Sequence, residues 1–499
     1  MRIEARCEGG LSQGFNFATI ASMSKFYLTS AIPYVNAAPH IGHAQEFVYA
    51  DVIRRYRSLL GDKVLYLCGA DENALKIVQA AEKAQLNPQE FTDLHQKEFL
   101  DLAEKLSVHF DVWQRGTDQI HHYPSSQKLW ELCQKNDDIY KKSYTGLYCV
   151  GCEQFYPKEE LDENGECFEH PGRKLEEVSE ENYFFRLSKY QSFIVDLIES
   201  DTLKILPTVR KNEALAFAKR GLEDFSISRS VQRAKGWGVP VSGDPDQIMY
   251  VWFDALNIYQ TGIGFGFDSE KFNTWSGQDC MVIGKGILRF HVVYWPAILK
   301  SAGLPLPKSC FSHGYLTVDG QKMSKSVGNV VNPLSVIEKY GTDAVRYYLL
   351  KEIPSYSDGD YSERRFKEVY NSDLAGGLGN LVARVAKLAE KTQSLSIKLF
   401  NFSVLASKTY NTELDEYRFN DALAMIWKKI KDADQFIDSN EPWKLEGKAL
   451  SSVIETASSK IIDIATLLEP FMPETSSKIV AQFTSEKITS QPSLFPRIT

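Results

Sequence analysis

The sequence has little of what marks secreted, membrane-spanning or disordered proteins. Only 8 of its 499 residues are cysteine, too few for a disulfide scaffold. Its longest nearly apolar stretch, residues 281–299, contains Lys285, Arg289 and His291 and so is not a membrane span. The N-terminus lacks the continuous apolar segment of a secretory signal. We therefore expect a globular, cytoplasmic protein.

Basic residues are not in excess either. The chain has 57 Lys and Arg against 65 Asp and Glu, a formal net charge of -8. This balance argues against indiscriminate binding of polyanions, although it is compatible with a local basic groove. Apolar residues make up 43% of the chain, which is enough for several domains with ordinary cores.

The order of apolar segments predicts the fold class. Residues 26–29 predict a strand, residues 42–60 a helix and residues 64–67 a buried strand. This order is typical of a doubly wound parallel α/β sheet of the Rossmann type. Further buried strands are predicted at 249–252, 281–283 and 310–311, so residues 140–245 interrupt the sheet as an insertion. Beyond residue 370 the apolar period is helical throughout, which predicts a C-terminal α-helical bundle.

Two short motifs carry candidate chemistry. The first, His-Ile-Gly-His at residues 40–43, lies between the first strand and the first helix. Imidazole N–H groups at a helix N-terminus can donate to phosphate oxygens. The second, Lys-Met-Ser-Lys-Ser at residues 322–326, follows the last predicted strand, and its ammonium groups could neutralise a triphosphate. Taken alone, each motif is also compatible with an ordinary surface loop that has no catalytic role. Taken together, the two motifs would face each other at the carboxyl ends of the strands, where ligands bind.

These two motifs, here named the histidine motif and the lysine motif, resemble those of class I aminoacyl-tRNA synthetases. The surrounding segments at residues 28–34, 69–73, 250–255 and 284–291 resemble the methionyl-tRNA synthetase family. The resemblance implies a methionine–tRNA ligase that forms methionyl-adenylate and pyrophosphate from methionine and ATP with Mg²⁺. It then transfers methionyl to the 3′-terminal ribose of tRNA(Met).

The resemblance also implies the site residues. The catalytic residues would be His40, His43, Lys322 and Lys325. ATP would be bound by these four with Gly42 and Ser324. The methionine pocket would consist of Ala31, Ile32, Tyr34, Asp71, Trp252, Ala255, Leu256, Tyr259, Ile287 and His291. Two departures from the family pattern are Asn73-Ala74, where a His-Gly pair is common, and Gly286, where an Asp is common.

A cluster of soft ligands lies in the insertion. Cys149, Cys152, Cys167 and His170 form a C-x2-C and a C-x2-H pair. This set suits a closed, structural Zn²⁺ site, although unrelated thiols and an imidazole are the alternative. In the C-terminal part, Asn380 and Arg384 share one helix face. By resemblance these two residues and Trp443 would read the anticodon; packing at a helix junction is the alternative for Trp443.

The sequence pattern and the resemblance together divide the chain into six segments. These are a flexible tail at 1–24, the first half of the catalytic domain at 25–139, the zinc-binding insertion at 140–245, the second half at 246–333, a stem-contact region at 334–370 and the anticodon-binding helices at 371–499. We expect a monomer, because the chain ends soon after these helices.

Two other functions compete with this interpretation. One is a class I synthetase for leucine, isoleucine, valine or cysteine. An insertion of about one hundred residues is short for a hydrolytic editing domain, which disfavours the first three. The other is a non-catalytic RNA-binding relative, which would have no use for two intact motifs.

Overall fold

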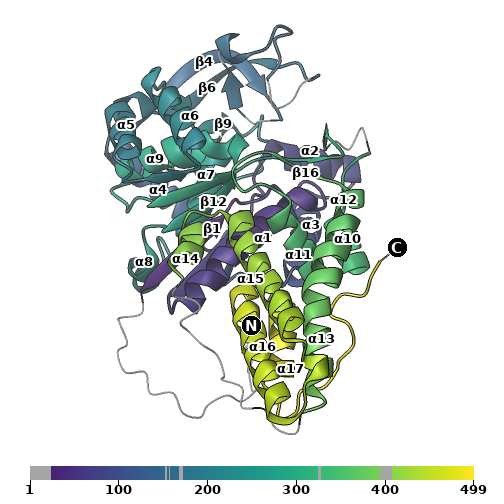
Figure 1. Ribbon diagram of the computed structural model, residues 1–499. Coiled ribbons are helices and arrows are strands. Elements are labelled where there is room, and N and C mark those ends of the chain that lie inside the picture. Colours follow the sequence, from purple (N-terminus) through teal and green to yellow (C-terminus); the bar gives the residue numbers. More distant parts are fainter. Residues whose placement is uncertain are drawn as a thin grey trace.

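The computed structural model describes residues 24–151, 154–156, 158–167, 172–323, 328–392, 395 and 407–498. The tail predicted at residues 1–24 lies outside this part except for Ser24, as do Ser324, Lys325, Cys152 and His170. Figure 1 shows an α/β body, with the insertion at one end and the C-terminal helices at the other.

A six-stranded parallel sheet forms the centre of the fold, which confirms the predicted α/β class. Its order is β3-β2-β1-β12-β13-β7. The strands are β1 (Lys25–Ser30), β2 (Lys63–Ala70), β3 (Val112–Arg115), β7 (Lys204–Leu206), β12 (Cys280–Gly284) and β13 (Ser309–His313). The chain moves outward from β1 through β2 to β3 and then returns to β12. The neighbours β1 and β12 therefore flank the point where strand order reverses, and ligands bind at such points.

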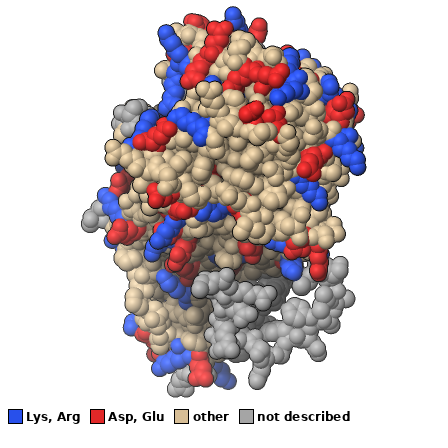
Figure 2. All heavy atoms as spheres, turned by 180° about the vertical axis from the view of Figure 1, so that it is seen from behind, with Lys and Arg blue, Asp and Glu red and all other residues tan. Residues whose placement is uncertain are grey.

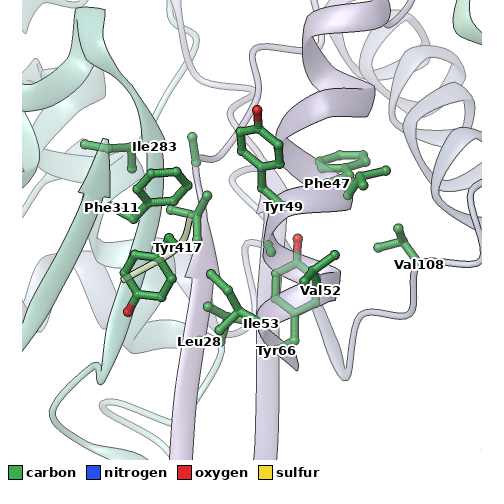
Figure 3. Close-up of a cluster of buried hydrophobic side chains, with 14 of the residues drawn as sticks. Leu28, Phe47, Tyr49, Val52, Ile53, Tyr66, Val108, Ile283, Phe311 and Tyr417 are labelled. Carbon is green, nitrogen blue, oxygen red and sulfur yellow. The ribbon is translucent and has the colours of Figure 1, made fainter. Parts of the chain in front are cut away.

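Helix α1 (Ile41–Leu59) covers the centre of this sheet. Figure 3 shows Tyr49, Val52 and Ile53 of α1 packed over Leu28 of β1 and Tyr66 of β2. The C-terminal part completes this core, because the Tyr417 ring lies 5.0 Å from the Phe311 ring of β13. The first turn of α1 is thus held against the carboxyl ends of the central strands.

The remaining helices of the α/β body lie between its strands in sequence. They are α2 (Leu75–Ala84), α3 (Pro88–Lys105), α4 (His122–Lys135), α7 (Val251–Thr261), α8 (Ser269–Trp275) and α9 (Trp295–Ala302). The strand predicted at residues 249–252 is wrong, because α7 begins at Val251 and β11 (Asp244–Met249) ends just before it. Every residue of α7 is buried. A helix buried on all sides shows no polar face, so its sequence resembles a buried strand.

The insertion contains two antiparallel sheets. One consists of β4 (Ile139–Cys149), β5 (Gln154–Tyr156), β6 (Glu176–Phe185) and β8 (Phe225–Ser226); the other of β9 (Ser228–Ser230), β10 (Pro240–Val241) and β11. Helices α5 (Gln191–Glu199) and α6 (Thr208–Lys219) flank β7. The sequence had suggested that residues 140–245 form an insertion separate from the central sheet. The structure differs at one strand of this segment, because β7 pairs with β13 at the edge of the central sheet.

After the central sheet comes a small sheet of β14 (Leu316–Val318), β15 (Gln321–Lys322) and β16 (Gly359–Tyr361). Helices α10 (Pro333–Tyr340), α11 (Thr342–Lys351) and α12 (Glu363–Val369) follow the lysine motif. The C-terminal helices are α13 (Asn380–Ala389), α14 (Lys408–Asp415), α15 (Phe419–Asn440), α16 (Gly447–Leu468) and α17 (Pro473–Phe483). The buried side chains of α15 recur at helical spacing along one face, from Phe419 to Ile437.

Charged side chains of both signs are mixed over the face in Figure 2. Among the helices of the described residues, none has the length and apolar character needed to cross a membrane.

Candidate active site

The histidine motif caps helix α1. The backbone N–H of Gly42 donates to Nδ1 of His40 (3.2 Å), and the backbone N–H of His40 donates to Nδ1 of His43 (3.1 Å). The two rings stack with centroids 3.8 Å apart. Because both Nδ1 atoms accept, each neutral ring carries its hydrogen on Nε2. Burial, with a contribution from His40, lowers the pKa of His43 well below its usual range, so His43 is a neutral donor.

The segment around the lysine motif meets this helix end. The backbone N–H of Ile41 donates to the carbonyl oxygen of Val331 (3.1 Å). A Cβ atom placed on Gly42 would lie 3.7 Å from Cε of Met323. Lys322 is exposed on β15, and its carbonyl oxygen accepts from Nδ2 of Asn329 (3.1 Å). The structure therefore brings the two motifs together at the start of α1, with Ser324 and Lys325 outside the described residues.

An aromatic cluster lies at the start of α7. Trp252 stacks flat on Phe290, with ring centroids 3.8 Å apart and planes 3° apart. Tyr34 meets the Trp252 indole edge-on at 6.3 Å. The backbones of Tyr34 and Asp71 form a β-bridge at the carboxyl ends of β1 and β2. This arrangement brings Tyr34, Asp71 and Trp252 together, as predicted for the pocket.

His291 closes the same cluster. Its Nδ1 donates to the carbonyl oxygen of Ile287 (3.0 Å), and its Nε2 accepts from the Tyr259 hydroxyl (2.9 Å). Burial lowers the pKa of His291 to about 4, so the ring is uncharged near neutral pH. An uncharged ring beside stacked aromatic rings suits an apolar, polarisable side chain such as a thioether.

The other predicted pocket residues occupy the elements around this cluster. Ala255 and Leu256 are buried on α7, Ala31 and Ile32 follow β1, and Ile287 lies between β12 and the π-helical turn Phe290–Tyr294. Phe290 is the residue that the pocket prediction missed. Phe290 is adjacent to His291 within residues 284–291, a segment that resembles the family. An aromatic residue beside a predicted pocket residue was therefore the feature of the sequence that could have identified it.

The first departure from the family pattern is part of a buried polar network. Nδ2 of Asn73 donates to the Asp254 carboxylate (2.7 Å) and to the Gly116 carbonyl oxygen (2.8 Å). The His122 ring bonds the other carboxylate oxygen of Asp254 and, through Nδ1, the hydroxyl of Thr261 (2.9 Å). Asn73 therefore fixes the carboxyl end of β2 to α7, which presents Trp252.

At the second departure, the Tyr315 side chain lies against the glycine. A Cβ atom on Gly286 would lie 1.8 Å from the hydroxyl oxygen of Tyr315. A larger residue at position 286 therefore requires the Tyr315 hydroxyl to move. The Lys285 ammonium lies 4.8 Å from the same ring and pairs with Asp358 (2.7 Å).

Half of the predicted zinc ligands are described. Sγ of Cys149, at the end of β4, lies 3.3 Å from Sγ of Cys167, and both residues are buried. Among the described residues no group of three or more Cys, His, Asp or Glu side chains is arranged to hold a metal ion. Cys152 and His170 lie outside the described residues, so only the two thiols of the predicted ligand set can be located. Cysteine sulfur is a ligand that suits Zn²⁺.

The three residues predicted to read an anticodon lie on the C-terminal helices. Asn380 and Arg384 are on α13, and Arg384 bridges to Asp434 (2.6 Å) and Asp438 (2.7 Å) of α15. Trp443 follows α15 and keeps 49% of its surface exposed. This exposure argues against the alternative that Trp443 is a packing residue.

Comparison with known proteins identifies the family. The family model for class I tRNA synthetases (M) matches residues 26–386. A methionine–tRNA ligase of Thermotoga maritima is 40% identical over 94% of this chain and 76% of its own length. One from Brucella suis is 37% identical over 92% of each chain. The solved structure of Mycobacterium tuberculosis methionyl-tRNA synthetase in complex with methionyl-adenylate is 36% identical, with a TM-score of 0.87 over 95% of this chain and 100% of that one. The chain belongs to the methionine–tRNA ligases, a family of class I aminoacyl-tRNA synthetases.

Proposed function

We propose that this chain activates L-methionine with ATP and transfers it to tRNA(Met) for initiation and elongation of translation. A carboxylate oxygen of methionine attacks the α-phosphorus of Mg²⁺-bound ATP. The bond from the α-phosphorus to the bridging oxygen breaks, and pyrophosphate leaves. A hydroxyl of the 3′-terminal ribose then attacks the carbonyl carbon of methionyl-adenylate, and AMP leaves. The single observation that carries this proposal is the meeting of the two motifs at the start of α1.

The two motifs act by binding and charge stabilisation. The Nε2–H groups of His40 and His43 donate to phosphate oxygens at the N-terminus of α1, where the helix dipole favours negative charge. Lys322 and Lys325 neutralise the departing pyrophosphate, and Gly42 and Ser324 complete the ATP site. Gly42 suits this place because a side chain there would press on the His40 ring, 3.0 Å away.

The aromatic cluster selects methionine. Trp252, Tyr34 and Phe290 form the walls against which the thioether packs, and Asp71 accepts from the α-ammonium group. The Tyr259 hydroxyl donates a hydrogen bond to Nε2 of His291. These two polar groups therefore already have a partner and need no charged group of the substrate. Ala31, Ile32, Ala255, Leu256 and Ile287 complete the apolar lining.

The parts outside the catalytic centre have separate roles. In the insertion, Cys149, Cys152, Cys167 and His170 hold one structural Zn²⁺, which closes a loop-rich module and supplies no catalytic ligand position. Residues 334–370 contact the tRNA stem. In the helical bundle at residues 371–499, Asn380, Arg384 and Trp443 bind the anticodon. We also propose that the protein is cytoplasmic and monomeric. Light scattering during size-exclusion chromatography tests the monomeric state, because it measures the mass of the protein in solution.

The deciding experiment is isotope exchange between pyrophosphate and ATP with single amino acids. Methionine should support exchange at least about 100-fold better than leucine, isoleucine, valine or cysteine, as expected when a substrate lacks the fitting side chain. Exchange with another amino acid, or with none, would overturn the proposal.

A further inference from the structure

Two side chains from the end of β13 lie over glycines at the end of the neighbouring strand β12. A Cβ atom on Gly284 would lie 3.7 Å from Cε1 of His313, and one on Gly286 would lie 1.8 Å from the hydroxyl oxygen of Tyr315. Nε2 of His313 also lies 3.1 Å from a carboxylate oxygen of Glu46, on α1 just after the histidine motif. The Tyr315 hydroxyl is therefore placed at the carboxyl ends of the central strands, where ligands bind.

The neighbours of Tyr315 hold it in this position. Its backbone N–H donates to the Asp358 carboxylate (2.8 Å), and its carbonyl oxygen accepts from the backbone N–H of Gly359 (3.0 Å). The Lys285 ammonium, 4.8 Å from the ring centroid, pairs with the same carboxylate (2.7 Å) and is attracted to the ring face. Tyr315 nevertheless keeps 36% of its surface exposed, so it is both held in place and open to a bound molecule.

The proposed reaction determines which part of the substrates lies nearest to this hydroxyl. The methionine carboxylate attacks the α-phosphate of ATP, so this phosphate lies between the methionine pocket and the histidine motif. Gly286 directly precedes Ile287 of the pocket lining, and the ribose is joined to the α-phosphate through a single oxygen. The ribose must therefore lie near the same strand end. A phenol hydroxyl can donate and accept a hydrogen bond, which suits the hydroxyl groups of a ribose.

We propose that the Tyr315 hydroxyl binds a ribose hydroxyl of ATP, and that Gly286 leaves the space through which it does so. Tyr315 is then a residue that determines the preference for a ribonucleotide over a deoxynucleotide. The inference rests on the proposed function, since it assumes that ATP is the substrate. It also gives the second departure from the family pattern a consequence, because the Tyr315 hydroxyl stands where a side chain at position 286 would begin.

Deoxynucleotides test this contact. Methionine-dependent exchange is measured with ATP, 2′-deoxy-ATP and 3′-deoxy-ATP, and the preference for ATP is the ratio of the kcat/KM values. Tyr315→Phe should lower the preference for ATP over at least one analogue about 3- to 10-fold, the loss expected for one neutral hydrogen bond. The dissociation constant for methionine should stay within about twofold. The control is Tyr140→Phe, which removes a hydroxyl bonded to Asp224 (2.8 Å) in the insertion and should leave both preferences unchanged.

Gly286→Ala displaces the same hydroxyl without removing it. The added Cβ atom forces the Tyr315 hydroxyl away, so this variant should lose the same preference. The double variant, Gly286→Ala with Tyr315→Phe, should lose no more than either single variant, because both act on one contact.

Three outcomes would overturn the inference. They are unchanged preferences in Tyr315→Phe, an equal fall of kcat/KM for all three nucleotides, and additive losses of preference in the double variant. The second outcome is the one expected of a merely structural role, because a change in packing affects the three nucleotides alike. Absence of methionine-dependent exchange with ATP in the unmodified protein would instead refute the proposed function.

Discussion

The backbone N–H of Ile41 donates to the carbonyl oxygen of Val331, 3.1 Å away. This bond joins the first turn of α1 to the segment that follows the lysine motif. It satisfies one of the helix N–H groups that have no partner within the helix. The two motifs are therefore tied together through the backbone, and the chemistry proposed for them depends on this proximity.

Gly42→Ala tests how closely the motifs pack. The added methyl group would lie 3.0 Å from Cε1 of His40 and 3.7 Å from Cε of Met323, so the His40 ring has to turn away. We expect methionine-dependent exchange to fall at least about tenfold, in line with the loss of one positioned donor. The matched control is Gly377→Ala, whose methyl group would meet only ordinary contacts, the nearest at 3.6 Å. Equal activity of the two variants would contradict the packing described.

His291 predicts a pH dependence of stability. Its pKa is about 4 in the folded protein because of burial, below its usual value near 6.5. Between these values the unfolded chain binds more protons, so this contribution to stability falls as the pH is lowered. From pH 7 to pH 5 the loss is about 2 kcal/mol.

Urea denaturation at the two pH values measures this loss. His291→Gln lacks the titrating imidazole. Between pH 7 and pH 5, its free energy of unfolding should therefore fall by about 2 kcal/mol less than that of the unmodified protein. Other groups, including His43, contribute equally to both proteins and cancel in the difference. The same pH dependence in both proteins would show that His291 is not buried as described.

Trp443 predicts a defect in tRNA binding alone. Trp443→Ala should lower kcat/KM for tRNA about 10- to 100-fold, because stacking of a base on an exposed ring contributes about 1–3 kcal/mol. Exchange without tRNA should not change. Phe267→Ala is the control, since Phe267 is similarly exposed at 51% but lies in the α/β body. A stability loss without a change in tRNA kinetics would support the packing alternative.

Cys149→Ser tests the zinc site. The purified protein should contain one Zn²⁺ per chain by elemental analysis, and the variant should contain much less than one. Its melting temperature should also fall, because a structural metal contributes folding free energy. Cys133→Ser is the control, as Cys133 is a buried thiol on α4 that donates to the Ile298 carbonyl oxygen. Full zinc content in Cys149→Ser would contradict the site.

The sequence was sufficient for the parallel sheet and for the meeting of the two motifs, since both depend on strand order and on motif position. It was misleading at α7, where burial on every side removed the polar face that distinguishes a helix. It gave no sign that β7 joins the central sheet, because a three-residue strand paired with a distant segment carries no local pattern. The close approach of the Tyr315 hydroxyl to Gly286 depends on two segments of the chain that meet only in the fold.

Lys325→Ala tests most directly whether the lysine motif serves the nucleotide. In single-turnover measurements its rate of methionyl-adenylate formation should fall by about 100- to 1,000-fold, the loss expected when a charge that stabilises the transition state is removed. The dissociation constant for methionine, measured by equilibrium dialysis, should stay within about threefold. An equal loss of adenylate formation and methionine affinity, or no loss of either, would contradict the account.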